Sequence, residues 1–132
     1  MDQNQIMQIQ MFEHEANALN QQLEIIEQNT RELQELNGSL DELEKKETKS
    51  ILAGLGKKIY IPVSIEEKKL LVEVGNKNFV KKSIPETKEV IVDQINKLSM
   101  GKTKILDKLN SLQEEINSLM IDIQKKVEKE KK

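Results

Sequence analysis

The residues of this sequence that could carry out chemistry are few and scattered. His14 is the only histidine and there is no cysteine, which excludes a histidine-based triad, a multi-histidine metal site and thiol chemistry. Adjacent acids occur at Glu66-Glu67 and Glu114-Glu115, but nothing in the sequence draws them into an apolar pocket. Gly54-Leu55-Gly56-Lys57 lacks the G-x-x-x-x-G-K-[ST] spacing of a phosphate loop and is better explained as a hairpin turn. The sequence therefore predicts no enzymatic activity, no cofactor and no metal.

The composition favours long exposed helices over a thick globular core. Of the 132 residues 33% are charged, and the only aromatic residues are Phe12, Tyr60 and Phe79. No apolar run approaches the roughly 20 residues that a membrane span needs. The N-terminus lacks the basic start and apolar stretch of a signal peptide, so we expect a soluble cytoplasmic protein with no membrane partner.

Two segments show the spacing of coiled-coil helices, in which apolar residues recur at steps of three and four. In the N-terminal segment, residues 1–47, the stripe contains Ile9, Phe12, Ala16, Leu19, Leu23, Ile26, Thr30, Leu33, Leu36, Leu40 and Leu43. In the C-terminal segment, residues 84–132, it contains Ile91, Ile95, Leu98, Lys102, Ile105, Leu109, Leu112, Ile116, Leu119 and Ile123. Ser83 and Glu86 fit a capping box at the start of this second helix, and Pro85 falls in its first turn.

The segment between the helices, residues 48–83, changes to the period of two that is typical of β-strands. We expect four short strands at about 50–54, 58–65, 69–74 and 78–82, paired as two hairpins. Gly54 and Gly56 mark one turn, and Gly75-Asn76-Lys77-Asn78 marks the other. Pro62 cannot donate to a strand ladder and should lie at an edge or a bulge.

The two helical stripes are nearly equal in length, which favours an antiparallel hairpin. Facing residues then have indices that add up to 131, as Leu19 and Leu112 or Leu40 and Ile91 do. Thr30 and Lys102, the two polar interruptions of the stripes, lie within one residue of this register and predict a polar layer that fixes it. The alternative is two unrelated imperfections. The predicted fold is α+β: one domain, residues 1–132, formed by a two-helix coiled-coil hairpin with a four-strand insert at its bend.

The insert should also be the site of oligomerisation, because two isolated hairpins expose edges and an apolar face that need cover. The residues that we expect to make this contact are Ile59, Ile61, Val63, Leu70, Val72, Val74, Phe79 and Val80.

The insert resembles the alpha class of prefoldin. The similarity lies in the stretches Leu55–Val63 and Leu70–Ser83, above all in Val74-Gly75 followed by Val80-Lys81-Lys82-Ser83, where one lysine is displaced from the family pattern V-G-x-x-x-x-V-x-K-[ST]. Two hairpins, rather than one, point to the alpha class. The resemblance implies a hexamer of two alpha and four beta-type subunits that holds unfolded proteins without ATP and passes them to a group II chaperonin. Some archaeal alpha-like relatives instead form homomeric filaments, which nothing in this sequence excludes.

In that topology both chain termini lie at the tips of the coiled coil, where the apolar residues exceed what a two-helix seam requires. The predicted client-binding residues are Ile6, Met7, Ile9, Met11, Phe12, Leu119, Met120, Ile121 and Ile123. Flexible methionines suit weak contact with many nonpolar clients. The alternative is that these side chains close the end of the coil or pack against another subunit.

Two other functions compete with a chaperone. A purely structural coiled-coil scaffold would share the fold and differ only in lacking affinity for unfolded proteins. A nucleic-acid-binding arm would use the basic end, residues 125–132, but that tail contains acids and has no aromatic residue for base stacking, so no nucleic-acid partner is expected.

Overall fold

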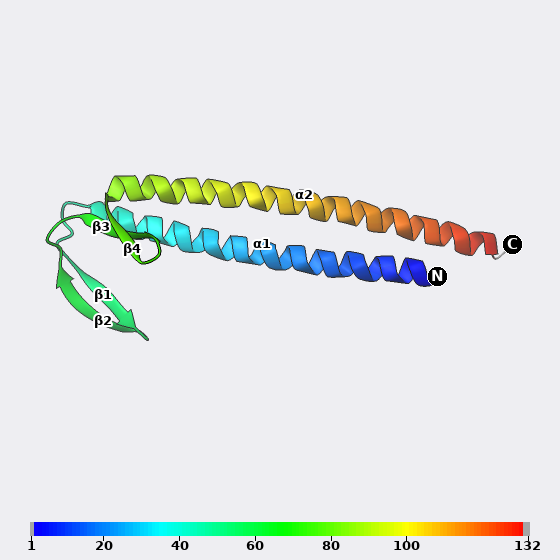
Figure 1. The fold of residues 1–132 in the computed structure, drawn as a ribbon, viewed down its shortest axis with the longest axis horizontal. Coiled ribbons are helices and arrows are strands. Elements are labelled where there is room, and N and C mark those ends of the chain that lie inside the picture. Colours follow the sequence, from blue (N-terminus) through cyan, green and yellow to red (C-terminus); the bar gives the residue numbers. More distant parts are fainter. Residues whose placement is uncertain (1, 131–132) are drawn as a thin grey trace. The chain divides into compact units, whose positions relative to one another are not determined.

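The computed structural model describes residues 2–130, which form two long helices with four strands between them. In chain order these are α1 (Gln3–Glu44), β1 (Ser50–Gly56), β2 (Ile59–Ser64), β3 (Lys69–Gly75), β4 (Asn78–Ser83) and α2 (Ile84–Glu130) (Figure 1). The predicted order of elements is confirmed, with helix and strand ends within a few residues of those expected. The chain divides into two compact units, residues 2–29 with 97–130, and residues 30–96.

In the first unit the beginning of α1 packs antiparallel against the second part of α2. Asp2 is paired with Lys126 and Glu27 with Lys102, so the partner's number falls as the number in α1 rises. The core consists of the buried residues Leu19, Ile105 and Leu112, against which lie the half-buried Phe12, Ala16, Leu23, Ile26, Leu109 and Ile116. All of these are stripe residues, because only side chains at alternating steps of three and four stay on the face between two helices.

The second unit has its own core at the end of α1 and the start of α2. Leu40, Ile84 and Ile91 are buried there, and Leu33, Leu43, Leu70 and Ile95 pack against them. Leu70 belongs to β3, so the second hairpin is attached to the helices by an apolar contact. Outside this core the Lys88 ammonium lies 3.2 Å from Oε2 of Glu44 and is also paired with Asp41.

The predicted place of Leu36 in the helical seam is wrong. Leu36 is 47% exposed, whereas Asn37 is half-buried. The steps of three and four continue without interruption through Leu33, Asn37 and Leu40, and this continuation places residue 37, not 36, between the helices. Oδ1 of Asn37 is buried and accepts no hydrogen bond from residues 2–130.

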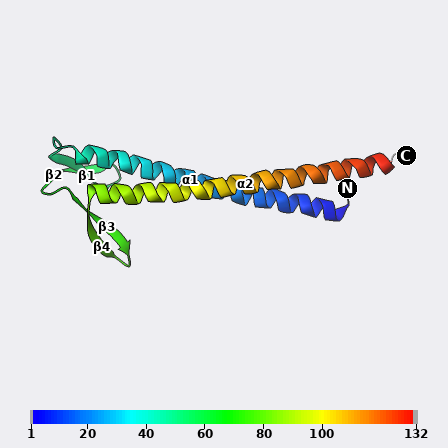
Figure 2. The same ribbon diagram turned by 90° about the horizontal axis from the view of Figure 1, so that it is seen from above.

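The four strands form two separate two-stranded sheets, β1 with β2 and β3 with β4 (Figure 2). Both hairpins turn over two residues that have positive φ, Lys57 and Lys58 in the first and Asn76 and Lys77 in the second. Two successive residues in the left-handed backbone conformation form the type of turn whose twist matches that of antiparallel strands. Pro62 lies in β2, which is an edge strand of its sheet, as predicted.

Ser83 caps the start of α2, as the sequence predicted, whereas the return contact from the Glu86 carboxylate stays a prediction. The Glu86 amide donates to Oγ of Ser83 at 3.2 Å, and Oγ1 of Thr87 donates to the Ser83 carbonyl at 2.9 Å. Ser83 is also the last residue of β4, so the strand leads into the helix without a loop.

Candidate functional site

The apolar side chains near the chain ends of the first unit divide into two sets. Ile9, Phe12, Leu119 and Ile123 are half-buried at the seam. Ile6, Met7 and Met11 of α1 are exposed, as are Met120 and Ile121 of α2, and Met11 reaches 69%. The second set contributes little to the pairing of the helices, so each of these five residues presents apolar surface to solvent.

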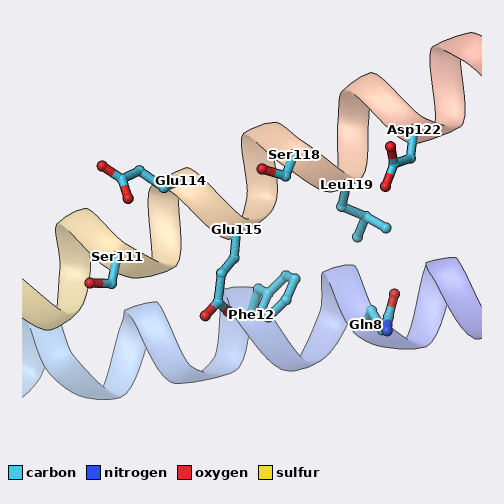
Figure 3. A pocket seen from close by; sticks show the side chains of 8 residues that line it. All are labelled: Gln8, Phe12, Ser111, Glu114, Glu115, Ser118, Leu119 and Asp122. Carbon is cyan, nitrogen blue, oxygen red and sulfur yellow. The ribbon is translucent and has the colours of Figure 1, made fainter.

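A shallow groove lies between the helices at the level of Phe12. Phe12 and Leu119 project into it from opposite helices, and the Glu115 side chain extends alongside the Phe12 ring (Figure 3). Gln8, Ser111, Glu114, Ser118 and Asp122 complete its lining. The apolar surface near the chain ends therefore includes a recess with an aromatic floor and an acidic rim.

Asp2 connects the two ends of the chain. Its Oδ1 accepts a hydrogen bond from the Gln5 amide at 2.8 Å, and its own amide donates to Oε1 of Gln5 at 3.2 Å. Lys126 Nζ lies 3.2 Å from Oδ2 of the same carboxylate. The hydrogen bond from Gln5, followed by that from Lys126, lowers the pKa of Asp2 below its ordinary value. This reciprocal cap was not predicted, although the spacing of Asp2 and Gln5 is a signal for it.

The insert presents the second large apolar surface. Among the residues predicted for oligomerisation, Val63, Leu70 and Val72 are half-buried, and the others, Ile59, Ile61, Val74, Phe79 and Val80, are exposed. Leu52, Leu55, Tyr60 and Leu71 are exposed as well and were not among the predicted residues. Aligning the two hairpins with each other could have found Leu55 and Tyr60, since they correspond to the predicted Val74 and Phe79. Leu52 and Leu71 correspond to each other, so this alignment would have found neither.

Charged contacts around the insert are local. Glu67 is paired with Lys81 of β4, and this hydrogen bond lowers the pKa of the Glu67 carboxyl. Hydrogen bonds from Lys88 to Asp41 and then to Glu44 raise the pKa of the Lys88 ammonium.

The two residues predicted to form a polar layer both lie in the helices and are half-buried. Nζ of Lys102 lies 3.6 Å from Oε1 of Glu27. The pairing of Thr30 with Lys102 stays a prediction.

Neither a metal site nor a membrane-spanning helix occurs among the described residues. Residues 2–130 contain no group of three or more His, Asp or Glu side chains that could hold a metal ion. No helix in the same range has an apolar stretch long enough to cross a bilayer. What the chain does offer is apolar surface, at its two ends and on its insert.

Comparison with known proteins decides the family. The family model described as "Prefoldin subunit" matches residues 12–129, which include most of both helices and the whole insert. The chain belongs to the prefoldin family. Its members are chaperones rather than enzymes.

One solved structure shows the same fold over nearly its full length. It is the cryo-EM structure of filamentous PFD from Methanocaldococcus jannaschii, with a TM-score of 0.76 and 19% sequence identity. The alignment covers 87% of this prefoldin chain and 97% of the other. A search of curated protein sequences found no match.

Proposed function

We propose that this prefoldin is a subunit of an ATP-independent holdase that captures unfolded proteins on the apolar side chains near its two chain ends. The observation that supports the proposal is the exposure of Met7, Met11, Met120 and Ile121 beside a seam that Phe12 and Leu119 already fill. Apolar residues that are surplus to packing are costly to leave in water unless they bind something.

The chemistry of these side chains suits unspecific capture. Methionine is unbranched and polarizable, so Met7, Met11 and Met120 can adapt to apolar segments of different shape. The groove beside Phe12 adds an aromatic surface, and a nonpolar client side chain that enters it would lose its contact with water. Each contact is weak, and several coiled coils acting together would hold a client by multivalency.

The insert would provide that multivalency. Two-stranded sheets are marginal by themselves, and both hairpins expose apolar side chains that subunit contacts would cover. We propose that the chain is of the alpha class and assembles with beta-type subunits, two alpha with four beta, in the cytoplasm. The captured protein would then be passed to a group II chaperonin.

The test is a set of substitutions that removes apolar surface and leaves the seam intact. Met7, Met11 and Met120 are changed to Gln and Ile121 to Asn, and the assembly is mixed with several unrelated denatured proteins without ATP. We expect aggregation, followed by light scattering, to be suppressed by the parent and not by the variant. Assembly mass should be unchanged.

Met100→Gln is the matched control, because Met100 is an equally exposed methionine of α2 far along the sequence from the chain ends. It should leave suppression intact. If the variant with all four substitutions still protects every client, capture at the chain ends is disproved. If the parent protein protects none, the structural scaffold is favoured.

A homomeric filament is the second candidate, favoured by the similarity to the filamentous PFD. Electron microscopy of the pure chain, with and without a beta-type subunit, distinguishes the two. Filaments that persist when the partner is present in excess would favour this candidate over the hexamer.

A further inference from the structure

The groove beside Phe12 lies in a part of the first unit that carries carboxylates and no Lys or Arg. In α1 neither residue type precedes Arg31, and in α2 none occurs between Lys108 and Lys125. The acids of residues 7–22 and 109–124, on the two antiparallel helices, are Glu13, Glu15, Glu114, Glu115 and Asp122. A recess surrounded by one sign of charge attracts ligands of the opposite sign.

The acids on the rim of the groove are available to such a ligand. Glu114, Glu115 and Asp122 are exposed, and none of them forms an ion pair with another residue of the range 2–130. The ion pairs of this unit lie to either side, at Lys126 and at Lys102. The charge of the rim is therefore not neutralised within the described part of the chain.

The apolar centre of the groove lies between two of these carboxylates. Leu119 follows Glu115 by four residues and precedes Asp122 by three, so each acid is about one helical turn away from it. With a rise of about 1.5 Å per residue, the two acids are about 10 Å apart along α2. Phe12 projects from α1 into the same groove (Figure 3). An apolar side chain that rests on Phe12 and Leu119 thus has a carboxylate on each side of it.

We propose that this groove binds segments of unfolded proteins in which an apolar side chain is flanked by Lys or Arg. In an extended chain, residues two apart point the same way and lie about 6.5–7 Å from each other. A segment of the pattern K-x-F-x-K can therefore place its ring on Phe12 and Leu119. Its two long basic side chains then reach Glu115 and Asp122.

The two kinds of contact have different effects on binding. Burial of the client ring supplies most of the affinity, whereas the carboxylates select among apolar segments by the charge of their neighbours. The inference rests on the proposed capture of unfolded proteins at the chain ends and specifies which segments are captured there.

Synthetic peptides of equal length, with both termini capped, test the selection. They contain K-G-F-G-K, E-G-F-G-E or K-G-G-G-K, and their binding to the assembled full-length chain is followed by fluorescence polarisation. We expect the basic Phe peptide to bind about tenfold or more tightly than the acidic one. The peptide without Phe should bind more weakly than the basic Phe peptide, because it buries no ring. The preference for the basic peptide should shrink between about 0.05 M and about 0.5 M salt, since exposed charges are screened.

Substitution of the two carboxylates tests whether they cause the preference. Glu115→Gln together with Asp122→Asn removes both charges and nearly preserves the side-chain shapes. Affinity for the basic Phe peptide should fall by about threefold to tenfold, and affinity for the acidic one should rise. The matched control, Glu24→Gln with Asp107→Asn, removes two exposed carboxylates that do not line the groove and should change neither affinity by more than about twofold. Circular dichroism verifies that both variants remain folded.

A dye at a single introduced cysteine locates the bound peptide, because the chain has no cysteine of its own. Ser118 lines the groove, and an environment-sensitive dye on Ser118→Cys should respond to the basic Phe peptide over the concentrations at which polarisation changes. The same dye on Ser99→Cys, at an exposed position of α2 outside the groove, should not respond.

Equal binding of the two Phe peptides by the parent protein would overturn the selection by charge, as would an unchanged preference in the variant that lacks both carboxylates. A dye at residue 118 that responds to the concentration of the chain alone, and not to the peptide, would show that the groove is a contact between copies of this chain. In these cases client capture can still hold. Its own failure is a different result, in which the parent protein protects no denatured client in the light-scattering assay.

Discussion

Lys126 Nζ lies 3.2 Å from Oδ2 of Asp2, a residue 124 positions earlier in the chain. The same carboxylate caps α1 through the Gln5 amide. One exposed side chain thus holds the first turn of α1 and connects it to the last turns of α2, beside the residues proposed to bind clients.

This arrangement predicts that the first turn of α1 frays in acid. The pKa of Asp2 is lowered by folding, so the stabilisation is present above the pKa of the unfolded chain and is lost as the pH falls through the lower, folded value. Amide exchange of residues 3–6, measured as a function of pH and corrected for intrinsic rates, should show protection decreasing in that acidic range. Asp2→Asn keeps an oxygen that can cap the helix and should abolish the pH dependence while retaining most of the protection. Unchanged pH dependence in this variant would rule out Asp2 as its source.

Asn37 predicts a substitution that stabilises the fold. Its Oδ1 is buried without a hydrogen bond from residues 2–130, and such a group loses the energy of solvation. Asn37→Leu should raise the free energy of unfolding by about 1–3 kcal/mol in urea titration. Asn29→Leu, at an exposed position of the same helix, should change it by less than about 0.5 kcal/mol. A loss of stability in Asn37→Leu would show that the amide makes a necessary contact.

Asn37 also shows where inference from the sequence reaches its limit. The helices, four strands, second turn and Ser83 cap follow from local patterns and were predicted correctly, whereas the first turn lies at Lys57 and Lys58, after Gly54 and Gly56 rather than at them. In the seam, the apolar Leu36 was predicted, but the half-buried residue is Asn37, because helix geometry depends on spacing and not on residue type.

Replacing the two glycines within the helices by alanine should also stabilise the fold. A Cβ at Gly101 would lie 3.6 Å from Cδ1 of Ile26, an ordinary contact, and one at Gly38 would meet no atom within 4 Å. Because glycine in a helix interior loses more backbone entropy than alanine, each change to Ala should stabilise the fold by about 0.5–1 kcal/mol. Gly56→Ala should have the opposite sign, since its φ of 119° is strained for any residue with a Cβ. Thermal unfolding of the three variants tests both statements, and a destabilised Gly38→Ala would contradict the entropic explanation.

Loss of the Ser83 cap should destabilise the chain locally, at the junction of β4 and α2. Its hydroxyl accepts from the Glu86 amide and no loop separates strand from helix, so loss of the cap acts on both elements. Ser83→Ala should cost about 1 kcal/mol in urea unfolding and increase amide exchange at Glu86, whereas Ser83→Asp restores the acceptor and should cost little. The adjacent Ile84 is buried in the core of the second unit, so fraying there should also reduce protection at Leu40 and Ile91. If exchange increases at Glu86 alone, the cap serves only the first turn of α2 and not the core beneath it.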